Sequence, residues 1–433
     1  MTVAAPRSLR LLGLALLLAG SGTPPLRAAS RAEILDRAVR VSDRLARIRR
    51  LDRGWEDGPY LVGSLLVWEE LQRDSPGVAM QLRDRVIEVV GDGTSPIFHG
   101  DSCGYAQAAL DLLRLASPLD ARRATFLRAT SGPLEFARLA MRYDASSGPP
   151  LPSWWVDGGY GTRYWQDDFY TLVPWLAMRG SSLDGLPADG LARNLAYEWI
   201  EAYAYDHRKS LSGAADRAVP ALFDRRGPLL LDEGSGLFWH DVGRIGQRDF
   251  WGRGNGWVAF ALARAQRFLD RPYDGGRFRS VLDAAAVRGL LSRMASTLAG
   301  ERNTFGTWNA DILRRDLFPV PESSGSALFT FMLGTGIDEG WLDRTAYTPI
   351  VLEAFQTLLL NLDDEDDLHN IQRTGTGPDS TFLTSDDPSS NSDFGVGAFL
   401  LAAAAVSRLP ESDLARLGSV NEVIVERGRF TTA

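Results

Sequence analysis

Two adjacent carboxylates, Asp167 and Asp168, stand among aromatic residues in the stretch Trp165–Tyr170. A glycine-rich, aromatic stretch precedes them and an apolar helical pattern begins at Tyr170, so the acids fall where a loop enters a helix. The free N–H groups and the dipole of a helix favour carboxylates at this position, so both acids could be helix caps. Two carboxyls between aromatic rings are also suited to acid–base chemistry, which makes this stretch the first candidate for a reactive site.

Aromatic side chains gather in several loops of the chain. Stacked rings cover the apolar faces of sugars, while scattered Asp, Arg, His and Asn side chains bind hydroxyls and carboxylates. This composition indicates a carbohydrate ligand, with core packing as the alternative for any single tryptophan. The aromatic residues concerned are Trp154, Trp155, Tyr160, Trp165, Trp239, Trp251, Trp257 and Trp308.

Three further residues have side chains that suit such a site. Asp101 lies at a second loop-to-helix junction and could face Asp167 across a shared opening, since glycan cleavage commonly uses two carboxyl groups. His240 stands beside Trp239 in one of the aromatic loops, and it could be a functional or a structural histidine. Arg253 could clamp an acidic sugar or neutralise a buried acid.

The sequence contains no convincing cofactor or metal motif. The glycines of Gly252–Gly256 follow no predicted strand, so dinucleotide binding is not supported. The four histidines include no pair at zinc-ligand spacing. The acidic run Asp363–Asp367 is most simply a solvated turn; a calcium site is the alternative, although the spacing is not that of an EF-hand. We therefore expect neither a cofactor nor a metal.

Residues 1–29 have the form of an export signal, with a basic start, a short apolar run over Leu11–Ala19 and small residues at the end. The apolar run is too short to span a bilayer, and no later stretch is long and apolar enough to do so. We expect an exported protein, periplasmic or extracellular, whose residues 30–433 form a single domain.

The net charge limits the kinds of partner that the protein can bind, and the cysteine content indicates what stabilises its fold. The formal net charge of the 433-residue chain is -8, and loss of the leader would make it more acidic, which argues against a nucleic-acid partner. Cys103 is the single cysteine, so a large hydrophobic core rather than internal disulfides must stabilise the fold. The expected assembly is a monomer or a homodimer.

Helical patterns follow one another along the chain, and alternating strand patterns are scarce. No strong linker divides them, which predicts one all-α domain. The predicted helices cover residues 32–50, 60–73, 79–90, 105–115, 121–143, 169–178, 190–205, 255–269, 278–298, 324–333, 346–360 and 395–409.

The loops rich in glycine and aromatic residues recur on alternate connections between these helices. Helix pairs in a closed ring would produce this pattern, with one set of loops gathered at one end, where binding sites are usually built. An α-solenoid is the alternative, because its helix pairs also alternate, but its loops need no tryptophans.

The stretch Phe250–Ala259 resembles the signature of the unsaturated uronyl hydrolases, glycoside hydrolase families 88 and 105, and especially the unsaturated rhamnogalacturonyl hydrolases. Four further motifs stand in the same order as in that family and together cover nearly the whole chain after the leader. They are Asp101–Gly104, Trp165–Asp168, Glu322–Ala327 and Asp393–Phe399.

The resemblance implies an (α/α)6 barrel of six helical hairpins and an anionic oligosaccharide substrate. It implies removal of a Δ4,5-unsaturated uronic acid from the non-reducing end of lyase products, by hydration of the enol-ether double bond. Asp167 matches the family's general acid/base, and Asp101 matches its second active-site aspartate. The expected substrate contacts are His240, Trp251, Arg253 and Trp257, which match family positions, together with the loop tryptophans Trp155 and Trp165.

Two departures from the family pattern leave the exact substrate open. Trp155–Gly158 has no histidine where many rhamnogalacturonyl members have one, and Asp393–Gly395 lacks the histidine of the family's late motif. An unsaturated glucuronyl hydrolase acting on glycosaminoglycan or ulvan fragments is therefore one alternative. A polysaccharide lyase, a sugar epimerase and a non-catalytic glycan-binding protein are the others.

Overall fold

The computed structural model of the protein describes residues 29–49, 51, 54–74, 77–91, 103–117, 119–130, 166–183, 186–204, 230–240, 246–247, 249–273, 282–375, 377–383 and 392–417. Regular structure in these ranges is helical, and the β-pairing consists of isolated bridges. The prediction of an all-α protein is confirmed. The expected export signal lies outside the described residues, apart from Ala29. No helix in the described part of the chain has the length and apolar character needed to cross a bilayer.

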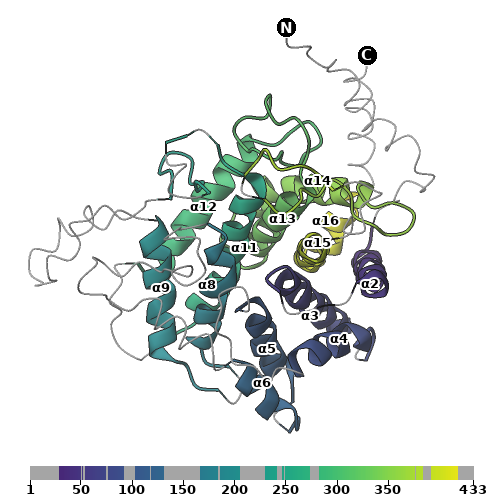
Figure 1. Cartoon of the computed structure of the whole chain (residues 1–433), viewed down its shortest axis with the longest axis vertical. Helices are drawn as coiled ribbons and strands as arrows, with labels where there is room; N and C mark the ends of the chain where they lie inside the picture. Colours follow the sequence, from purple (N-terminus) through teal and green to yellow (C-terminus); the bar gives the residue numbers. More distant parts are fainter. Residues whose placement is uncertain are drawn as a thin grey trace, which may run out of the picture.

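Within the described ranges, six helices form a closed inner ring, in which each helix packs against the next and the last packs against the first (Figure 1). Helices enclosed by protein are apolar on every side, and every residue of the last ring helix is buried. The ring consists of α3 (Asp57–Asp74), α5 (Cys103–Leu115), α8 (Asp168–Arg179), α11 (Gly252–Leu269), α13 (Ser323–Asp338) and α15 (Asp393–Val406).

A second set of helices packs around this ring, each against one or two ring helices. These outer helices are α2 (Arg31–Ile48), α4 (Met80–Gly91), α6 (Arg123–Ala129), α9 (Gly190–Ala204), α12 (Ala284–Gly300) and α14 (Arg344–Leu360), and the short α16 (Glu411–Leu414) follows α15. Only part of the helix predicted at 121–143 is described, as α6. Because α15 closes against α3, the arrangement is a ring of paired helices and not an α-solenoid.

Helix α2 shows why the outer helices could be predicted from the sequence. Its N-cap Ser30 and Glu33 form a capping box, and its buried residues recur every three or four positions. The helix packs on both α3 and α15, so it covers the junction where the ring closes. The buried residues are Ile34, Leu35, Ala38, Val41, Ser42 and Leu45.

The helix predicted at 255–269 begins earlier than expected, because α11 starts at Gly252, so the glycines of Gly252–Gly256 lie in its first turns and not in a loop. The glycines in this stretch permit close packing instead of a turn. A Cβ atom at Gly252 would lie 2.6 Å from the Asn309 carbonyl oxygen, and one at Gly256 would lie 2.9 Å from the Leu328 side chain. The first turns of α11 can therefore lie closer to α13 and its preceding loop than a residue with a side chain would permit.

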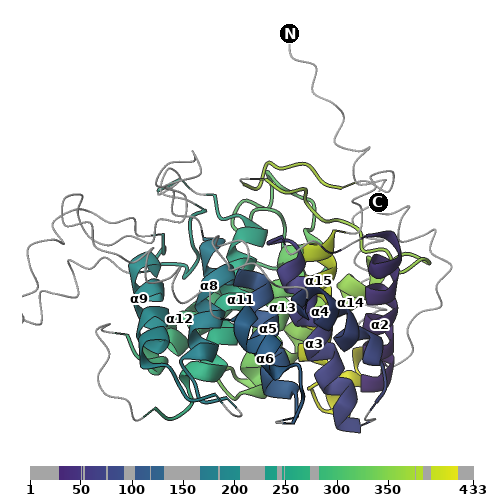
Figure 2. The same cartoon turned by 60° about the horizontal axis from the view of Figure 1, so that its bottom comes forward.

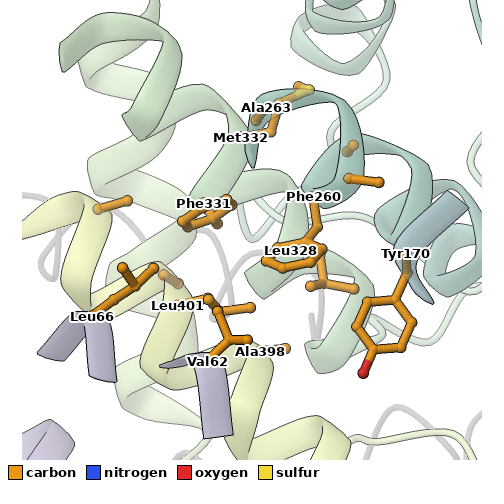
Figure 3. Packing of buried hydrophobic residues seen from close by; sticks show 14 of the residues in the cluster. Val62, Leu66, Tyr170, Phe260, Ala263, Leu328, Phe331, Met332, Ala398 and Leu401 are labelled. Atoms are coloured by element: carbon orange, nitrogen blue, oxygen red, sulfur yellow. The ribbon is translucent and has the colours of Figure 1, made fainter. Parts of the chain in front are cut away.

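Apolar side chains from the ring helices fill its interior. Figure 3 shows them converging from five of the ring helices: Val62 and Leu66 from α3, Tyr170 from α8, Phe260 from α11, Leu328 and Phe331 from α13, and Ala398 and Leu401 from α15. A core of this size supplies the stability that the lack of internal disulfides requires.

The acidic run Asp363–Asp367 contains the predicted solvated turn at its exposed residues Asp364 and Glu365, but several of its acids have partners. Arginines of α2 engage it: Arg37 lies 2.8 Å from Asp366, and Arg44 lies 2.7 Å from Asp367. His369 adds a contact of 2.8 Å to Asp363. The turn is therefore tied to the first outer helix, and it begins the loop that leads towards α15.

Candidate active site

The first turns of the ring helices meet at one end of the barrel, here called the mouth. The Tyr170 hydroxyl of α8 donates to the Trp55 carbonyl just before α3, at 2.9 Å, and the Trp55 ring packs on Trp257 of α11. The loops that lead into α13 and α15 rise on one side of the barrel (Figure 2). Carboxylates are favoured at helix N-termini, and the described acids at these starts include Asp57, Asp167, Glu322 and Asp393.

Asp167 holds the N-cap position of α8, but its side chain does not cap the helix. Its Oδ2 atom lies 3.1 Å from Nε2 of His240, and the Gln166 N–H donates to the His240 carbonyl at 3.0 Å. The Asp167 side chain is 28% exposed, whereas the His240 side chain is 4% exposed. An accessible carboxyl group oriented by a buried imidazole can exchange a proton with a ligand. The capping interpretation of Asp167 is therefore wrong.

The first turn of α11 fixes the backbone next to His240. The Asn255 side chain accepts from the Phe238 N–H at 2.7 Å and donates to the Phe238 carbonyl at 3.0 Å. The imidazole of His240 stands edge-on to the Trp251 ring, with centroids 5.0 Å apart. Trp251 and Asn255, which follow His240 by 11 and 15 residues in the sequence, thus help to hold its imidazole beside Asp167.

Arg253 is fully buried beneath this pair. One terminal nitrogen donates to the Gln372 carbonyl at 2.5 Å, and the other donates to the Arg373 carbonyl at 2.7 Å. The guanidinium also lies over the rings of Trp251 and Phe394, 4.7 and 4.8 Å from their centroids. Arg253 therefore joins α11 to the loop before α15.

Burial lowers the pKa of Arg253, while the nearby charges of Glu322 and Asp167 act in the opposite direction. Among the described residues, a carboxylate oxygen of Glu322 lies 3.9 Å from a terminal nitrogen of Arg253. Of the two roles that the sequence left open, neutralising buried acid fits this geometry more closely than clamping a substrate carboxylate, because the Arg253 side chain is 1% exposed and each terminal nitrogen donates to a backbone carbonyl.

Trp257 packs below the mouth and is 1% exposed. It contacts the rings of Tyr170, Trp55 and Phe394, with centroids 4.8, 6.3 and 6.4 Å apart. Trp257 thus supports the floor of the mouth, while the partly exposed Trp55, stacked on Phe394 at 5.6 Å, reaches closer to solvent.

Three predicted site residues, Asp101, Trp155 and Trp165, lie outside the described residues. The expected approach of Asp101 to Asp167 across the mouth therefore stays a prediction. Asp168 is the first residue of α8. Of the other predicted residues, the structure brings together Asp167, His240, Trp251 and Arg253, and Trp257 joins them through the ring of Phe394.

The sequence did not single out Gln372, which links several parts of the mouth. Its amide oxygen accepts from the Trp251 indole N–H at 2.8 Å, and its amide nitrogen donates to the Ser380 carbonyl at 2.9 Å. Glu322 caps α13 by accepting from the Gly325 N–H and also accepts from the Gln372 N–H. No motif marks Gln372, whereas Trp55 stands in an aromatic, acidic and glycine-containing stretch like that of Asp167 and could have been found.

Among the described side chains, no group of three or more His, Cys, Asp or Glu residues is placed to hold a metal ion. The acids at the mouth are instead engaged by arginine, histidine or backbone N–H groups, as described for Asp167 and Glu322. The chemistry that this part of the chain can supply is proton transfer from a carboxyl group.

A closed ring of paired helices with an acid–imidazole pair at its mouth defines an (α/α)6 barrel with a candidate active site. The chain belongs to Glycosyl Hydrolase Family 88, whose family model matches residues 161–410. This match includes Asp167, His240 and Arg253.

Individual relatives agree with this assignment. An unsaturated 3S-rhamnoglycuronyl hydrolase from Formosa agariphila is 31% identical over 162 residues, which cover 37% of this chain and 40% of that protein. A family 88 glycosyl hydrolase from Bacteroides vulgatus has the same fold, with a TM-score of 0.63, 21% identity and coverage of 88% of this chain and 99% of the other. An unsaturated glucuronyl hydrolase from Bacillus sp. GL1 superposes with a TM-score of 0.56, 14% identity and coverage of 86% and 96%.

Proposed function

We propose that the protein is a glycoside hydrolase that removes a Δ4,5-unsaturated uronic acid from the non-reducing end of lyase-generated oligosaccharides. The observation that carries this proposal is the partly exposed Asp167 carboxyl, held 3.1 Å from the buried His240 at the mouth of a family 88 barrel. A carboxyl group in this position can serve as general acid and then as general base.

In the proposed reaction, the Asp167 carboxyl group gives its proton to C4 of the enol-ether double bond. Water adds at C5, and its proton returns to the Asp167 carboxylate. The resulting hemiketal opens and releases the remaining saccharide, so one water is consumed and the carboxyl group is restored. His240 orients Asp167 throughout, and the aromatic residues of the mouth offer apolar surfaces to the sugar rings.

We propose rhamnose as the sugar that follows the unsaturated uronic acid. The named relative from Formosa agariphila, an unsaturated 3S-rhamnoglycuronyl hydrolase, supports this choice, although the match spans two-fifths of its length. The glucuronyl hydrolase from Bacillus sp. GL1, described as acting in glycosaminoglycan degradation, supports the alternative substrate. The export pattern at residues 1–29 further suggests that the enzyme meets these fragments outside the cytoplasm.

The test is to incubate the purified protein with lyase-generated oligosaccharides and to follow the ultraviolet absorbance of the conjugated enol ether. Uronyl-rhamnose fragments with and without sulfate and uronyl fragments of glycosaminoglycans form the three arms. We expect absorbance to fall fastest with a rhamnose-linked fragment. No loss in any arm contradicts the proposed activity, and loss only with glycosaminoglycan fragments contradicts the proposed sugar.

The same signal separates the alternative activities. A polysaccharide lyase would create the absorbance from an intact polysaccharide, and a sugar epimerase would leave it unchanged. A glycan-binding protein would bind the fragments in a calorimeter without turnover.

A further inference from the structure

The junction between the first and last ring helices contains a buried pair of carboxyl groups. Asp57 begins α3 and Asp393 begins α15, and each residue is 1% exposed. Their carboxyl groups lie close enough to influence each other's ionisation, and neither side-chain oxygen of Asp393 accepts a well-oriented hydrogen bond from a described donor. Because two carboxylates have only acceptors, the two groups can hydrogen-bond to each other only if one of them keeps a proton.

The charges around the pair also favour retention of that proton. The guanidinium of Arg49, at the C-cap of α2, brings its Nε to 2.9 Å from Oδ2 of Asp393. In the part of the chain that the structure describes, Arg49 is the cation that pairs with Asp393, and Glu56 adds a third acid nearby. Ionisation of both Asp57 and Asp393 would therefore place more negative than positive charge among these described groups. Burial, followed by the hydrogen bond and charge of Asp57, raises the pKa of Asp393 to about 8.

The pair is connected to the rings that shape the mouth. Phe394 follows Asp393 directly in the sequence and its ring stacks on Trp55. The Arg253 guanidinium lies over the face of the same ring. Trp55 stands two residues before Asp57. Trp55, Trp257 and Phe394 are here called the mouth wall. Any separation of Asp57 from Asp393 would move two of its three rings.

Packing beyond the pair allows α3 and α15 little freedom to adjust. A Cβ atom at Gly63 of α3 would lie 2.8 Å from the Leu400 side chain, and glycine at 397 permits a similar approach to the backbone of Tyr60. Two helices in such close contact cannot accommodate a second buried charge by a small shift at one residue.

We propose that Asp57 and Asp393 act as a positioning pair, which shares one proton, holds the mouth wall in place and sets an alkaline limit to turnover when that proton is lost. The part of this proposal that concerns turnover depends on the proposed function. The part that concerns the mouth wall does not.

Several other described groups face the pair or the mouth wall from neighbouring elements. Arg49 comes from the end of α2, Glu56 from the start of α3, Tyr170 from α8, Arg253 from α11 and Glu322 from the start of α13. Arginine keeps its charge across the accessible pH range, and free tyrosine titrates near pH 10. A transition near pH 8 that disappears on substitution of Asp57 or Asp393 therefore belongs to the pair.

The first experiment follows tryptophan fluorescence of the full protein from pH 5 to pH 10. We expect a transition with a midpoint near pH 8 in the unsubstituted protein. Asp393→Asn keeps a hydrogen-bonding side chain that cannot ionise, so the transition should vanish; Asp57→Asn should act in the same way and serves if the first variant fails to fold. Asp84→Asn, at an exposed acid of α4, is the matched control and should keep the transition.

The second experiment measures kcat/KM for the unsaturated oligosaccharide across the same pH range. Above about pH 8, log(kcat/KM) of the unsubstituted enzyme should fall by one additional unit per pH unit, and Asp393→Asn should remove this additional slope. A fluorescence transition or an additional slope that persists in Asp393→Asn overturns the proposal. If no oligosaccharide is turned over at any pH, the proposed function fails, and the fluorescence experiment still decides whether the pair positions the mouth wall.

Discussion

At the residue scale, the contact between Asp167 and His240 is the most specific feature of the mouth. We expect His240→Ala to reduce kcat by up to ~10²-fold without unfolding the protein, because loss of the imidazole leaves the carboxyl group poorly oriented. His369 forms a similar contact with Asp363 in the acidic turn that follows α14 and packs against α2. His369→Ala is therefore the matched control and should leave kcat within about twofold. Equal effects of the two substitutions on kcat would contradict the orienting role of His240.

Arg253 offers a residue-scale test between a structural and a substrate-binding role. Arg253→Lys keeps the charge but lacks the planar fork that binds two carbonyls, so the free energy of unfolding should fall by about 2 kcal/mol. Urea denaturation measures this loss. Arg193→Lys is the control, because Arg193 donates to the Phe268 and Leu269 carbonyls at the end of α11, away from the mouth. This variant should also be less stable, but its KM should not change. Unchanged stability with a raised KM in Arg253→Lys would instead assign this arginine to the substrate.

At the element scale, the glycines of α11 test whether close helix packing builds the mouth. A Cβ atom at Gly254 would meet the Gln166 side chain and lie 2.7 Å from the Trp251 ring, so Gly254→Ala should destabilise the protein by about 2 kcal/mol despite alanine's higher helix propensity. Gly289 of the outer helix α12 has no neighbour within 4 Å of such an atom, and Gly289→Ala should stabilise by up to ~1 kcal/mol. Urea midpoints that move in the same direction for both variants would contradict this explanation.

The same helices show how far the sequence can predict the fold. Periodicity located α2 and α14 to within two residues, because each of these helices buries one face or is bounded by capping acids. It misplaced the start of α11, where glycine signals close packing as well as a turn. The partnership of Asp167 and His240 could be inferred only through family resemblance, since a contact across 73 residues leaves no local pattern. Gln372 and the Asp57–Asp393 pair depend on ring closure and were not predicted.

At the scale of the whole molecule, α2 covers the junction of α3 and α15 that closes the ring, and it is tied to the acidic turn after α14. Arg44→Ala removes a two-pronged contact with Asp367 and should lower the free energy of unfolding by about 1 kcal/mol in low salt and by less in 1 M NaCl. Asp36→Ala breaks an exposed pair with Arg40 on the same helix and should have almost no effect. Thermal denaturation compares the variants, and added calcium should not raise Tm if arginines rather than a cation neutralise the turn. A calcium-dependent rise would restore the metal-site interpretation.

The central claim is that a family 88 barrel uses Asp167 as general acid on an unsaturated uronyl substrate. The most direct measurement is the loss of enol-ether absorbance from a rhamnose-linked unsaturated oligosaccharide, recorded for the unsubstituted protein, Asp167→Asn and Asp168→Asn. The account predicts turnover by the unsubstituted protein, a loss of at least ~10²-fold in Asp167→Asn and a smaller loss in Asp168→Asn. The account would be contradicted if Asp167→Asn kept its turnover, or if Asp168→Asn reduced turnover more than Asp167→Asn does.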